Sequence, residues 1–496
     1  MSPELVEAPP AFDPVKVGFF RFRRILGKVL VTNDLGRHRL LSEEDFRRFA
    51  AGEIGPDDPA YRALCDDGFV RDRMDFDVLS RAWAERHRYL WDGPNLHVVV
   101  VTLRCDHRCV YCHASSVRLE DRSTDMTEET ARTVVDRIFA SPSKALTIEF
   151  QGGEPLANWP IVRLIVEEAL ERNRREGRSL WLNLVTNLSL MDDEKLDWLL
   201  ERGVNFCTSL DGPAQLHDRN RPRPGGGGHA GVARWYREIQ KRTKRRAFRI
   251  DALLTVTRNS LDKPREIVDS YDELGARSLF LRPLNPYGTA TASWSKIGYT
   301  PEEFLVFYRA ALDRVLELNR KRPRARPFVE QTARLFLAKI LTDRDPNFLD
   351  LRSPCGAGVG QLAYNWDGAV YTCDEGRMLA RMGDDTFRIG SAAEGSYEES
   401  VAHPTVRALA VASCLDNQPS CSSCAYKPYC GVCPVQCYKE QGDIMGRMPT
   451  NTHCRINMGV LDFLFERLQD SGNARIFKTW LKQREGVVGE ASYRRA

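Results

Sequence analysis

Short apolar runs alternate with segments of helical periodicity from residue 96 to about residue 286. The apolar runs predict strands at 96–103, 145–150, 180–186, 204–210, 250–256 and 277–284. The segments between them predict helices at 127–140, 160–173, 192–203, 231–242 and 265–275. A strand-then-helix chain forms a parallel sheet, and continuously apolar strands need cover on both faces. The sequence therefore predicts an α/β fold, either a barrel or a doubly wound sheet.

The chain on either side of this region has a different pattern. The N-terminal residues predict a small unit with a short antiparallel sheet, followed by short helices at 43–52 and 59–69. Two longer helices, at 301–321 and 328–341, precede a region in which the helix signal weakens and Gly and Pro become frequent. We therefore expect five segments, at 1–93, 94–300, 301–350, 351–470 and a C-terminal tail at 471–496.

The composition is that of an ordinary globular chain long enough for roughly three domains. Its 72 Lys and Arg residues against 68 Asp and Glu residues leave a formal charge of only +4, so a nucleic-acid partner is not expected. No apolar run approaches the roughly 18 residues that a membrane span requires, and the N-terminus lacks the pattern of a signal peptide. We expect a cytoplasmic protein with no membrane partner, whose 14 cysteines stay reduced.

Most of these cysteines are clustered. Three lie at 105, 109 and 112, nine lie between 355 and 454, and only Cys65 and Cys207 stand alone. Buried structural thiols, which are the alternative, would be dispersed through the core. Clustering therefore favours metal or iron-sulfur ligation.

Cys105, Cys109 and Cys112 follow directly on the first strand of the alternating region. Structural zinc sites use four ligands, whereas three cysteines leave one iron of a four-iron cluster open. This CX3CX2C spacing, with Tyr111 before the last cysteine, resembles the radical S-adenosylmethionine (SAM) superfamily. In that family the open iron binds the amino and carboxylate groups of SAM, and an electron from the cluster cleaves the sulfonium to give a 5′-deoxyadenosyl radical.

The strand ends that follow carry further family motifs. Gly152-Gly153-Glu154-Pro155 matches the GGEP motif, in which Glu154 would accept hydrogen bonds from the SAM amino group. The resemblance implies a partial (β/α)6 TIM-like barrel whose site lies at the C-terminal strand ends. It also implies that the SAM-binding residues include Tyr111, Gly152, Gly153, Glu154, Asn187, Ser209 and Arg221. We add Gln151 as a candidate catalytic residue. The alternative for each position is a turn or surface residue.

The cysteines after residue 350 resemble a SPASM domain, the auxiliary-cluster module of many peptide-modifying radical enzymes. By this resemblance one four-iron cluster is held by Cys421, Cys424, Cys430 and Cys454, and another by Cys355, Cys373 and Cys433. The fourth ligand of the second set is expected to be Cys437, with Cys414 as the alternative, because the family commonly has a cysteine in CX3C spacing after Cys430 and position 434 is Pro here. The chain would then hold three 4Fe-4S clusters. A zinc ribbon is the competing interpretation, since CX2C pairs also bind zinc.

Asp374 follows Cys373 directly. An Asp at the matching place in anaerobic sulfatase maturases is the proposed base for the peptide side chain, so the resemblance makes Asp374 a candidate catalytic residue. The alternative is a carboxylate that orients the neighbouring ligands or faces water.

The N-terminal unit resembles the peptide-recognition element of ribosomal-peptide maturases, which captures a leader peptide as an added strand. Its dense aromatic and basic run, 19–24, would suit apolar anchors and acidic leader residues. The unit could instead be a structural lid on the barrel.

Across nearly the whole chain the sequence is most similar to radical SAM/SPASM maturases of His-Xaa-Ser repeat peptide systems, and more distantly to anaerobic sulfatase maturases. The resemblance implies hydrogen abstraction from a side chain of a ribosomally made precursor peptide and a crosslink of the cyclophane type, with flavodoxin or ferredoxin as reductant. The alternatives are oxidation of Ser or Cys to formylglycine and a non-catalytic metal-bearing scaffold.

Overall fold

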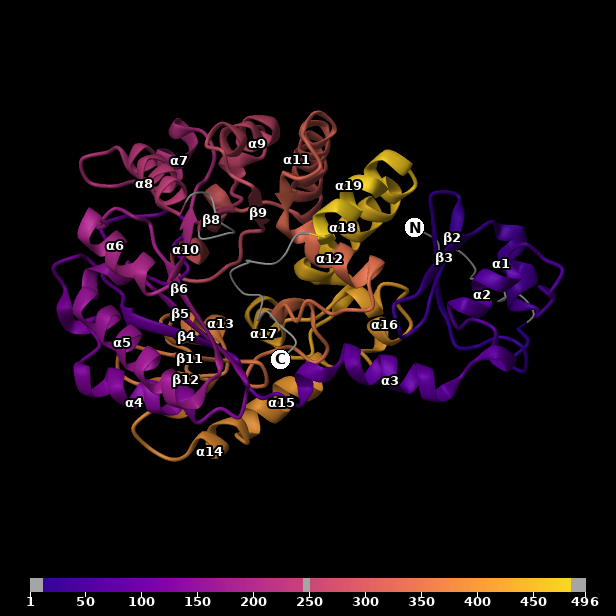
Figure 1. Ribbon diagram of the computed structural model, residues 1–496, viewed down its shortest axis with the longest axis horizontal. Coiled ribbons are helices and arrows are strands. Elements are labelled where there is room, and N and C mark those ends of the chain that lie inside the picture. The colour runs from indigo at the N-terminus through magenta and orange to yellow at the C-terminus, as the bar shows by residue number, and fades with distance from the viewer. Residues whose placement is uncertain (1–11, 244–249, 483–496) are drawn as a thin grey trace.

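A ten-stranded sheet in the order β10-β9-β8-β7-β6-β5-β4-β11-β12-β13 forms the centre of the protein in the computed structural model, which describes residues 12–243 and 250–482 (Figure 1). Strands β4 to β9 are all parallel and lie where the apolar runs predict them. Their bounds are β4 Leu96–Thr102, β5 Ala145–Gly152, β6 Ser179–Val185, β7 Asn205–Ser209, β8 Ile250–Thr255 and β9 Ser278–Arg282. The predicted α/β fold with a mostly parallel sheet is therefore confirmed, and β10 and β13 are its open ends.

The C-terminal region contributes strands to this sheet, which the sequence does not predict. Strand β10 (Val329–Glu330) pairs in parallel with β9, and β11 (Gln361–Tyr364) pairs in parallel with β4. Strands β12 (Ala369–Tyr371) and β13 (Arg388–Ser391) extend the same edge in antiparallel pairing. Strands of two to four residues carry too little periodicity to be recognised. The expected boundary at residue 350 is therefore not a structural separation, because the C-terminal region continues the sheet.

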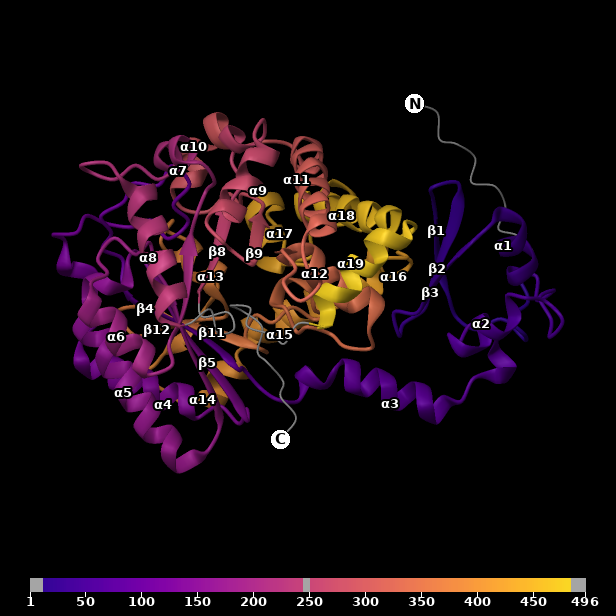
Figure 2. The same cartoon turned by 45° about the horizontal axis from the view of Figure 1, so that its top comes forward.

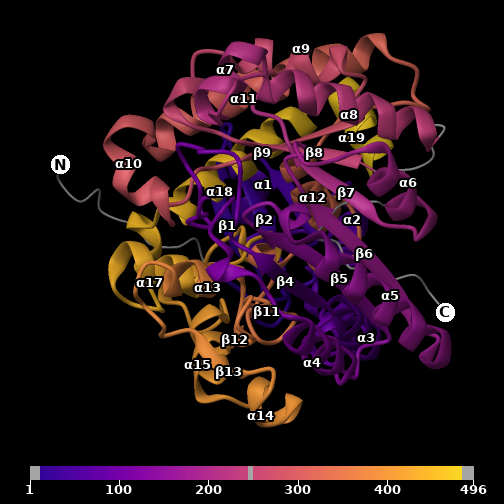
Figure 3. The same cartoon turned by 90° about the vertical axis from the view of Figure 1, so that its left-hand side faces the viewer.

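Helices cover the sheet in the predicted positions (Figure 3). The helices between the parallel strands are α4 (Glu128–Phe139), α5 (Trp159–Glu176), α6 (Asp193–Glu201), α8 (Gly228–Arg242) and α9 (Pro264–Glu273), together with two short ones that the sequence does not predict, α7 (Ala214–Asn220) and α10 (Thr289–Ile297). Thr300 opens α11 (Pro301–Lys321) with a capping box that Glu303 completes. Among these helices, α4, α6 and α11 begin at a residue whose side chain accepts from a first-turn amide, namely Thr127, Asp192 and Thr300.

The C-terminal region is mostly helical. Its helices are α12 (Gln331–Leu341), α13 (Asp374–Ala380), α14 (Tyr397–Val401), α15 (Pro404–Ser413), α16 (Pro419–Ser422), α17 (Pro434–Gln441), α18 (Thr452–Leu468) and α19 (Ser471–Lys482). Phe477 and Trp480 of α19 are fully buried, so the expectation of a tail from residue 471 is wrong as far as residue 482. The rest of that segment, like the first 11 residues, lies outside the described part of the chain. Within the described ranges no helix combines the length and apolarity needed to cross a bilayer.

The N-terminal unit stands beside the rest of the molecule (Figure 2). Strands β1 (Arg21–Ile25), β2 (Lys28–Thr32) and β3 (His38–Leu41) form the predicted antiparallel sheet, and α1 (Glu43–Ala50) and α2 (Tyr61–Asp66) follow. Ser42 caps α1 by accepting a hydrogen bond from the Asp45 amide, 3.0 Å away. The unit has its own apolar core, and helix α3 (Phe76–Arg86) leads back to the main body.

This unit binds the backbone of the segment 421–430. Arg21 Nε donates to the Ser422 carbonyl at 2.6 Å, and the Thr32 hydroxyl donates to the Ala425 carbonyl at 2.8 Å. Arg86 donates to the Pro428 carbonyl at 2.9 Å, and Arg23 pairs with Asp462 at 3.0 Å. Arg21 and Arg23 therefore face the C-terminal region and not an incoming peptide, because alternate residues of β1 point to opposite sides.

Candidate active site

The loop of residues 105–112 is held from two sides. The amides of Arg108 and Val110 donate to the carbonyls of Pro222 and Asn220, at 2.7 and 2.9 Å. On the other side, the Thr289 amide donates to the Cys112 carbonyl at 2.9 Å. Cys105, Cys109 and Cys112 all line one cavity of about 300 Å³. The backbone fixes the loop, so the three thiols are placed before any metal binds.

The three thiols fit an iron-sulfur cluster. Burial raises the pKa of Cys105 and Cys109, and the neighbouring thiols raise the Cys105 pKa further. A set of thiols that repel one another as thiolates is stabilised by a cationic metal centre, which deprotonates them. The fourth cysteine of the cavity, Cys207, interacts electrostatically with Glu149 and Asp251 instead, so this site offers three thiols and not the four of structural zinc.

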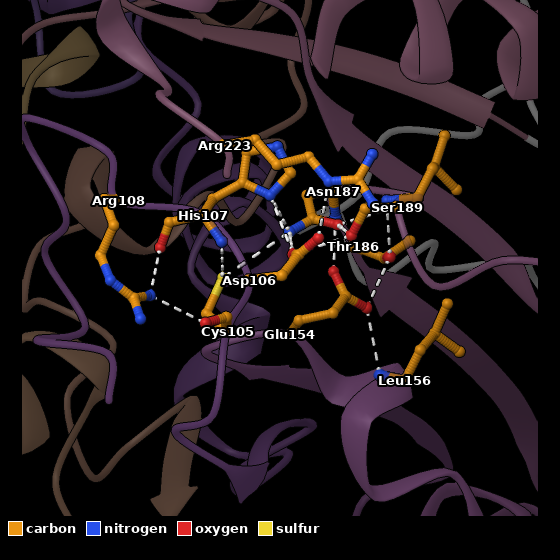
Figure 4. A network of polar contacts seen from close by, with 11 residues as sticks. Cys105, Asp106, His107, Arg108, Glu154, Leu156, Thr186, Asn187, Ser189 and Arg223 are labelled. Atoms are coloured by element: carbon orange, nitrogen blue, oxygen red, sulfur yellow. Dashed lines mark hydrogen bonds and ion pairs between the residues drawn. The ribbon is translucent and has the colours of Figure 1, made fainter. Parts of the chain in front are cut away.

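Asp106 organises the polar groups behind Cys105 (Figure 4). Its carboxylate accepts from the Ser189 hydroxyl at 2.8 Å, from Asn187 Nδ2 at 3.1 Å and from Arg223 Nε at 2.9 Å. Burial opposes ionisation of Asp106, but hydrogen bonds from His107, Ser189 and Asn187 lower the Asp106 pKa. Cys105, Asp106 and His107 could also hold a single ion, but the Asp106 oxygens are already occupied by these donors. The network therefore positions the cysteine loop.

Gly152 and Gly153 bring the end of β5 against the end of β4. Gly152 has φ +126°, and a Cβ there would collide with the Thr102 carbonyl oxygen. A Cβ on Gly153 would collide with the carbonyl oxygens of Leu103 and Arg104. Both glycines also line the cavity. The two glycines thus allow β5 to approach the backbone that leads from β4 into the loop of the three thiols.

Glu154 lies behind the cavity wall. Its carboxylate is fully buried and accepts from the Thr186 hydroxyl at 2.7 Å and from the amides of Asn187 and Leu156 at 2.8 and 3.1 Å. Burial raises the Glu154 pKa to about 7, although these hydrogen bonds oppose the shift. The carboxylate joins the ends of β5 and β6 next to the cavity wall, and its contact with the SAM amino group stays a prediction.

Replacing Glu154 with Gln should loosen this junction. A Gln side chain has one acceptor oxygen, so at least one of the three donors loses its partner, at a cost of about 1–3 kcal/mol. We expect a lower midpoint in denaturant unfolding and a lower affinity for SAM, because Asn187 is displaced. Glu129→Gln, on the exposed face of α4, serves as the control. An unchanged unfolding midpoint would show that the buried carboxylate does not join the strands.

Arg221 supplies a buried cation to the cavity. Its Nη1 donates to the Tyr111 hydroxyl at 2.8 Å, and that hydroxyl donates to both oxygens of Asp211 at 2.8 Å. Burial raises the Asp211 pKa to about 6, and the charge of Arg221 opposes the shift. Arg221, Tyr111, Asn187 and Ser209 all line the cavity with the thiols. A guanidinium fixed in this way can bind a ligand carboxylate.

The two candidate catalytic residues also line this cavity. Asp374, at the start of α13, accepts from Arg377 Nε at 2.8 Å and Nη2 at 2.7 Å. Gln151 Nε2 donates to Glu149 at 2.7 Å. Asp374 and the loop of residues 105–112 are about 260 residues apart in the chain, and both line the same cavity. One cavity therefore connects the three thiols with the carboxylate next to Cys373.

The remaining cysteines form two groups. Cys355, Cys373 and Cys433 share one buried cluster with Tyr287. Cys421 and Cys454 pack in another, and the pKa values of both are raised by Cys424 and Cys430. Cys437, the expected fourth ligand of the first group, packs with the second because α17 turns its thiol that way. Cys414 is partly exposed beside Asp416 and belongs to neither cluster.

Comparison with known proteins agrees with the composition of this site. The family model described as the radical SAM superfamily matches residues 99–278, which include the three thiols, both glycines and Arg221. The chain carries a radical SAM domain. No helix or strand of the N-terminal unit falls within the matched residues.

Relatives of this chain include a sulfatase-maturating enzyme and a cyclopropyl synthase. A cysteine-type anaerobic sulfatase-maturating enzyme of Clostridium perfringens is 23% identical over 386 residues, which are 74% of this chain and 95% of that protein. An uncharacterized protein of Archaeoglobus fulgidus is 25% identical over 77% of this chain and 83% of its own. The radical SAM cyclopropyl synthase TigE of Paramaledivibacter caminithermalis is 29% identical over only 24% of this chain and 27% of its own.

Solved structures share the fold. The sulfatase maturase anSMEcpe with bound AdoMet aligns with a TM-score of 0.63 at 20% identity, over 76% of this chain and 99% of that one. Streptococcus suis SuiB bound to S-adenosylmethionine aligns with a TM-score of 0.51 at 15% identity, over 87% of this chain and 98% of that one. At this identity the likeness concerns the fold.

Several residues of the radical SAM domain's cavity were not identified from sequence. Glu149, Asp251 and Arg282 lie on strands and line the cavity. Tyr287 and Gln331 also line the cavity, but neither lies on a strand. A charged residue within an otherwise apolar strand was the available signal for Glu149 and Asp251, because such a residue must face a polar interior. Gly288 carries no comparable signal, although a Cβ there would collide with the Cys112 carbonyl.

Proposed function

We propose that this protein is a radical SAM enzyme that modifies a ribosomally made precursor peptide, by abstracting hydrogen from a side chain and forming a crosslink of the cyclophane type. The observation that carries the proposal is the single cavity that joins the three thiols and Arg221 to the carboxylates beside Cys373. The relationship to a sulfatase-maturating enzyme over 95% of that protein's length supports a polypeptide substrate. So does the likeness to anSMEcpe solved with AdoMet and a peptide, with a TM-score of 0.63.

The proposed cofactors are SAM and three 4Fe-4S clusters, two of them in a SPASM-like C-terminal region. The first cluster would be held by Cys105, Cys109 and Cys112, and it would supply the electron that cleaves the sulfonium of bound SAM. Cys421, Cys424, Cys430 and Cys454 would hold one auxiliary cluster, and Cys355, Cys373 and Cys433 the other. The packing of Cys437 with Cys421 and Cys454 leaves the second set with three thiols. We propose flavodoxin or ferredoxin as the reductant, in a cytoplasm that keeps these thiols reduced.

Peptide capture is assigned to the N-terminal unit. Strand β1 pairs only with β2, so its other edge is free for an added strand among the described residues. Phe19 is 58% exposed and Phe22 is 40% exposed, and both are available as apolar anchors. Arg24, on the same side of β1 as Phe22, pairs with Glu43 at 2.7 Å. We therefore propose Phe19, Phe22 and Arg24 as the peptide-binding residues, in place of the whole aromatic and basic run 19–24.

The proposal is tested with the peptide encoded beside the gene. Anaerobic reaction of that peptide with the reconstituted enzyme, SAM and dithionite should give a product whose tandem mass spectrum lacks fragments between two linked residues. A product that reacts with a hydrazide would instead favour oxidation of Ser or Cys to formylglycine, the function of the sulfatase-maturase type. An unmodified peptide despite SAM cleavage would contradict peptide modification.

Replacing Asp374 with Asn tests the proposed base. A substrate radical that is oxidised to product must lose a proton, and a carboxylate fixed by Arg377 at the cavity wall can accept it. We expect Asp374→Asn to keep its iron and its formation of 5′-deoxyadenosine but to lose at least tenfold in product, a barrier increase of about 1.4 kcal/mol. Glu375→Gln, the neighbouring cavity carboxylate, is the matched comparison.

An Asp374→Asn enzyme that forms product at the normal rate would exclude the base role. Loss of the iron near Cys373 in the same variant would assign Asp374 to support of the cluster, since Cys373 caps the same helix.

A further inference from the structure

The inner wall of the cavity is unusually polar for the interior of a parallel sheet. Alternate strand residues face inward, and on three of the strands these include Glu149 and Gln151, Asp251, and Ser278 and Arg282. The cavity is lined by five carboxylates, from Glu149, Asp251, Asp350, Asp374 and Glu375, and by three guanidiniums, from Arg221, Arg282 and Arg377. Of these guanidiniums, Arg377 is paired with Asp374 and Arg221 lies beside Asp211. The wall therefore holds more carboxyl groups than guanidiniums, and burial raises the pKa of Glu149, of Asp251 to about 6 and of Glu375 to about 7.

Two acceptor atoms on this wall have no partner among the described residues. Glu149 is 6% exposed, and its Oε1 accepts from Gln151 while its Oε2 is without a hydrogen bond. Gln331 is 4% exposed, and its Oε1 is likewise without a hydrogen bond. Buried polar atoms are rarely left unpaired, and an unpaired buried carboxylate oxygen is costly. Atoms of this kind that line a cavity indicate a ligand that brings donors.

Glu149 and Asp251 act on the same region of the cavity. Both raise the pKa of Cys207, which lies between their strands on β7. Asp251 accepts from the Ser278 hydroxyl at 2.5 Å. Burial raises the pKa of Glu149 and raises that of Asp251 to about 6, while the charge of Arg282 opposes the shift at Glu149. A cation bound between the two strands would therefore favour the charged form of both carboxyl groups.

The depth of Glu149 restricts the shape of the ligand. Glu149 precedes Gly153 by four residues, which is roughly 13 Å of extended strand. Gly153 stands at the thiol end of the cavity, beside the backbone of β4. A group that contacts both ends must be long and narrow. An extended side chain with a donor at its tip meets this requirement, and a compact one does not.

We infer that Glu149, with Asp251 and Gln331, binds a cationic side chain of the substrate peptide, that of Lys or Arg. The inference rests on the proposed function, because it assigns the substrate class of the same cavity. The ammonium or guanidinium would donate to Glu149 Oε2 and Gln331 Oε1, and its charge would neutralise the carboxylates. Glu149 and its two neighbours are then residues that determine specificity.

The test uses single-residue probes with the anaerobically reconstituted, SAM-loaded enzyme. The probes are the radiolabelled N-acetyl methylamides of lysine and arginine, with those of norleucine and glutamine as uncharged controls, and binding is measured by equilibrium dialysis. We expect at least one of the cationic probes to bind at least tenfold more tightly than norleucine and glutamine. Glu149→Gln, which removes the charge and keeps the shape, should abolish that preference. Glu171→Gln, on the exposed surface of α5, should leave it intact.

Equal affinity of all four probes for the unaltered enzyme would overturn the inference, and so would an unchanged preference in Glu149→Gln. Gln331→Met provides a second variant, expected to weaken the preference, if Glu149→Gln fails to load iron. Formation of 5′-deoxyadenosine without probe is measured in parallel. SAM cleavage without a preference for cations contradicts only the binding site, whereas a cation preference without SAM cleavage contradicts only the proposed function.

Discussion

Replacing Cys105, Cys109 and Cys112 together with Ala should abolish SAM cleavage and remove about a third of the iron. Three four-iron clusters correspond to about 12 iron atoms, of which this loop would hold about four. The other nine clustered cysteines lie in a separate stretch of chain, and six of them pack in two clusters of their own. The loop is also tied by its own backbone hydrogen bonds, so the change should not spread. Iron analysis and chromatography of 5′-deoxyadenosine measure the two effects.

Cys65→Ala is the control for this variant, because Cys65 stands alone on α2 of the N-terminal unit. It should retain the full iron content and the full rate of SAM cleavage. A triple variant that still cleaves SAM would refute the assignment of the loop. Loss of all the iron would refute the independence of the three groups.

Deleting residues 1–92 should abolish peptide modification and also remove about four iron atoms. The first effect follows from the loss of leader capture, which supplies effective concentration. The second follows from the contacts with the segment 421–430, because the deletion removes the donors Arg21, Thr32 and Arg86 and the Gly36 carbonyl that Tyr429 binds. Cys421, Cys424 and Cys430 lie in that segment. Uncoupled SAM cleavage should persist, since the three-thiol loop is held by other elements.

The double variant Phe19→Ala/Phe22→Ala separates these two effects. Both side chains are exposed and neither forms the hydrogen bonds to the segment 421–430. Its iron content should therefore be unchanged, while the KM for the full precursor should rise at least tenfold. Turnover of the full precursor by both variants at the rate of the unaltered enzyme would make the N-terminal unit a structural lid. Full iron retention by the deletion variant would show that its contacts do not support the cysteine segment.

The sheet was predictable from sequence where its strands are long and apolar. Strand β4 has the sequence LHVVVVT and is buried at every position. A continuous apolar run of this kind predicts a strand that is covered on both faces. The sequence of the three-residue β12 predicts a loop. Its place in the sheet depends on pairing with β11, which in turn pairs with β4, a strand far away in the sequence. The sequence suggests a tail where α19 lies, because Trp480 is buried by contacts with distant segments that the local sequence does not show. Local signals thus identified the long elements, and only the assembled fold places the short ones.

The site was predictable where spacing alone determines chemistry. Cys105, Cys109 and Cys112 converge because they share one short loop, and Gly152 and Gly153 are required by the approach of β5 to β4. Glu154 was assigned a ligand contact from its motif, whereas its burial and three internal donors can be seen only in the structure. The direction in which the Cys437 thiol points depends on the rotation of α17 about its axis. The spacing of the cysteines in the sequence does not specify this rotation.

Anaerobic reconstitution with iron and sulfide, followed by metal analysis and reaction with SAM and dithionite, tests the central claim most directly. The account predicts about 12 iron atoms per chain and the formation of 5′-deoxyadenosine, both sensitive to the replacement of Cys105, Cys109 and Cys112. Stoichiometric zinc with little iron after anaerobic purification, and intact SAM after reaction, would contradict it.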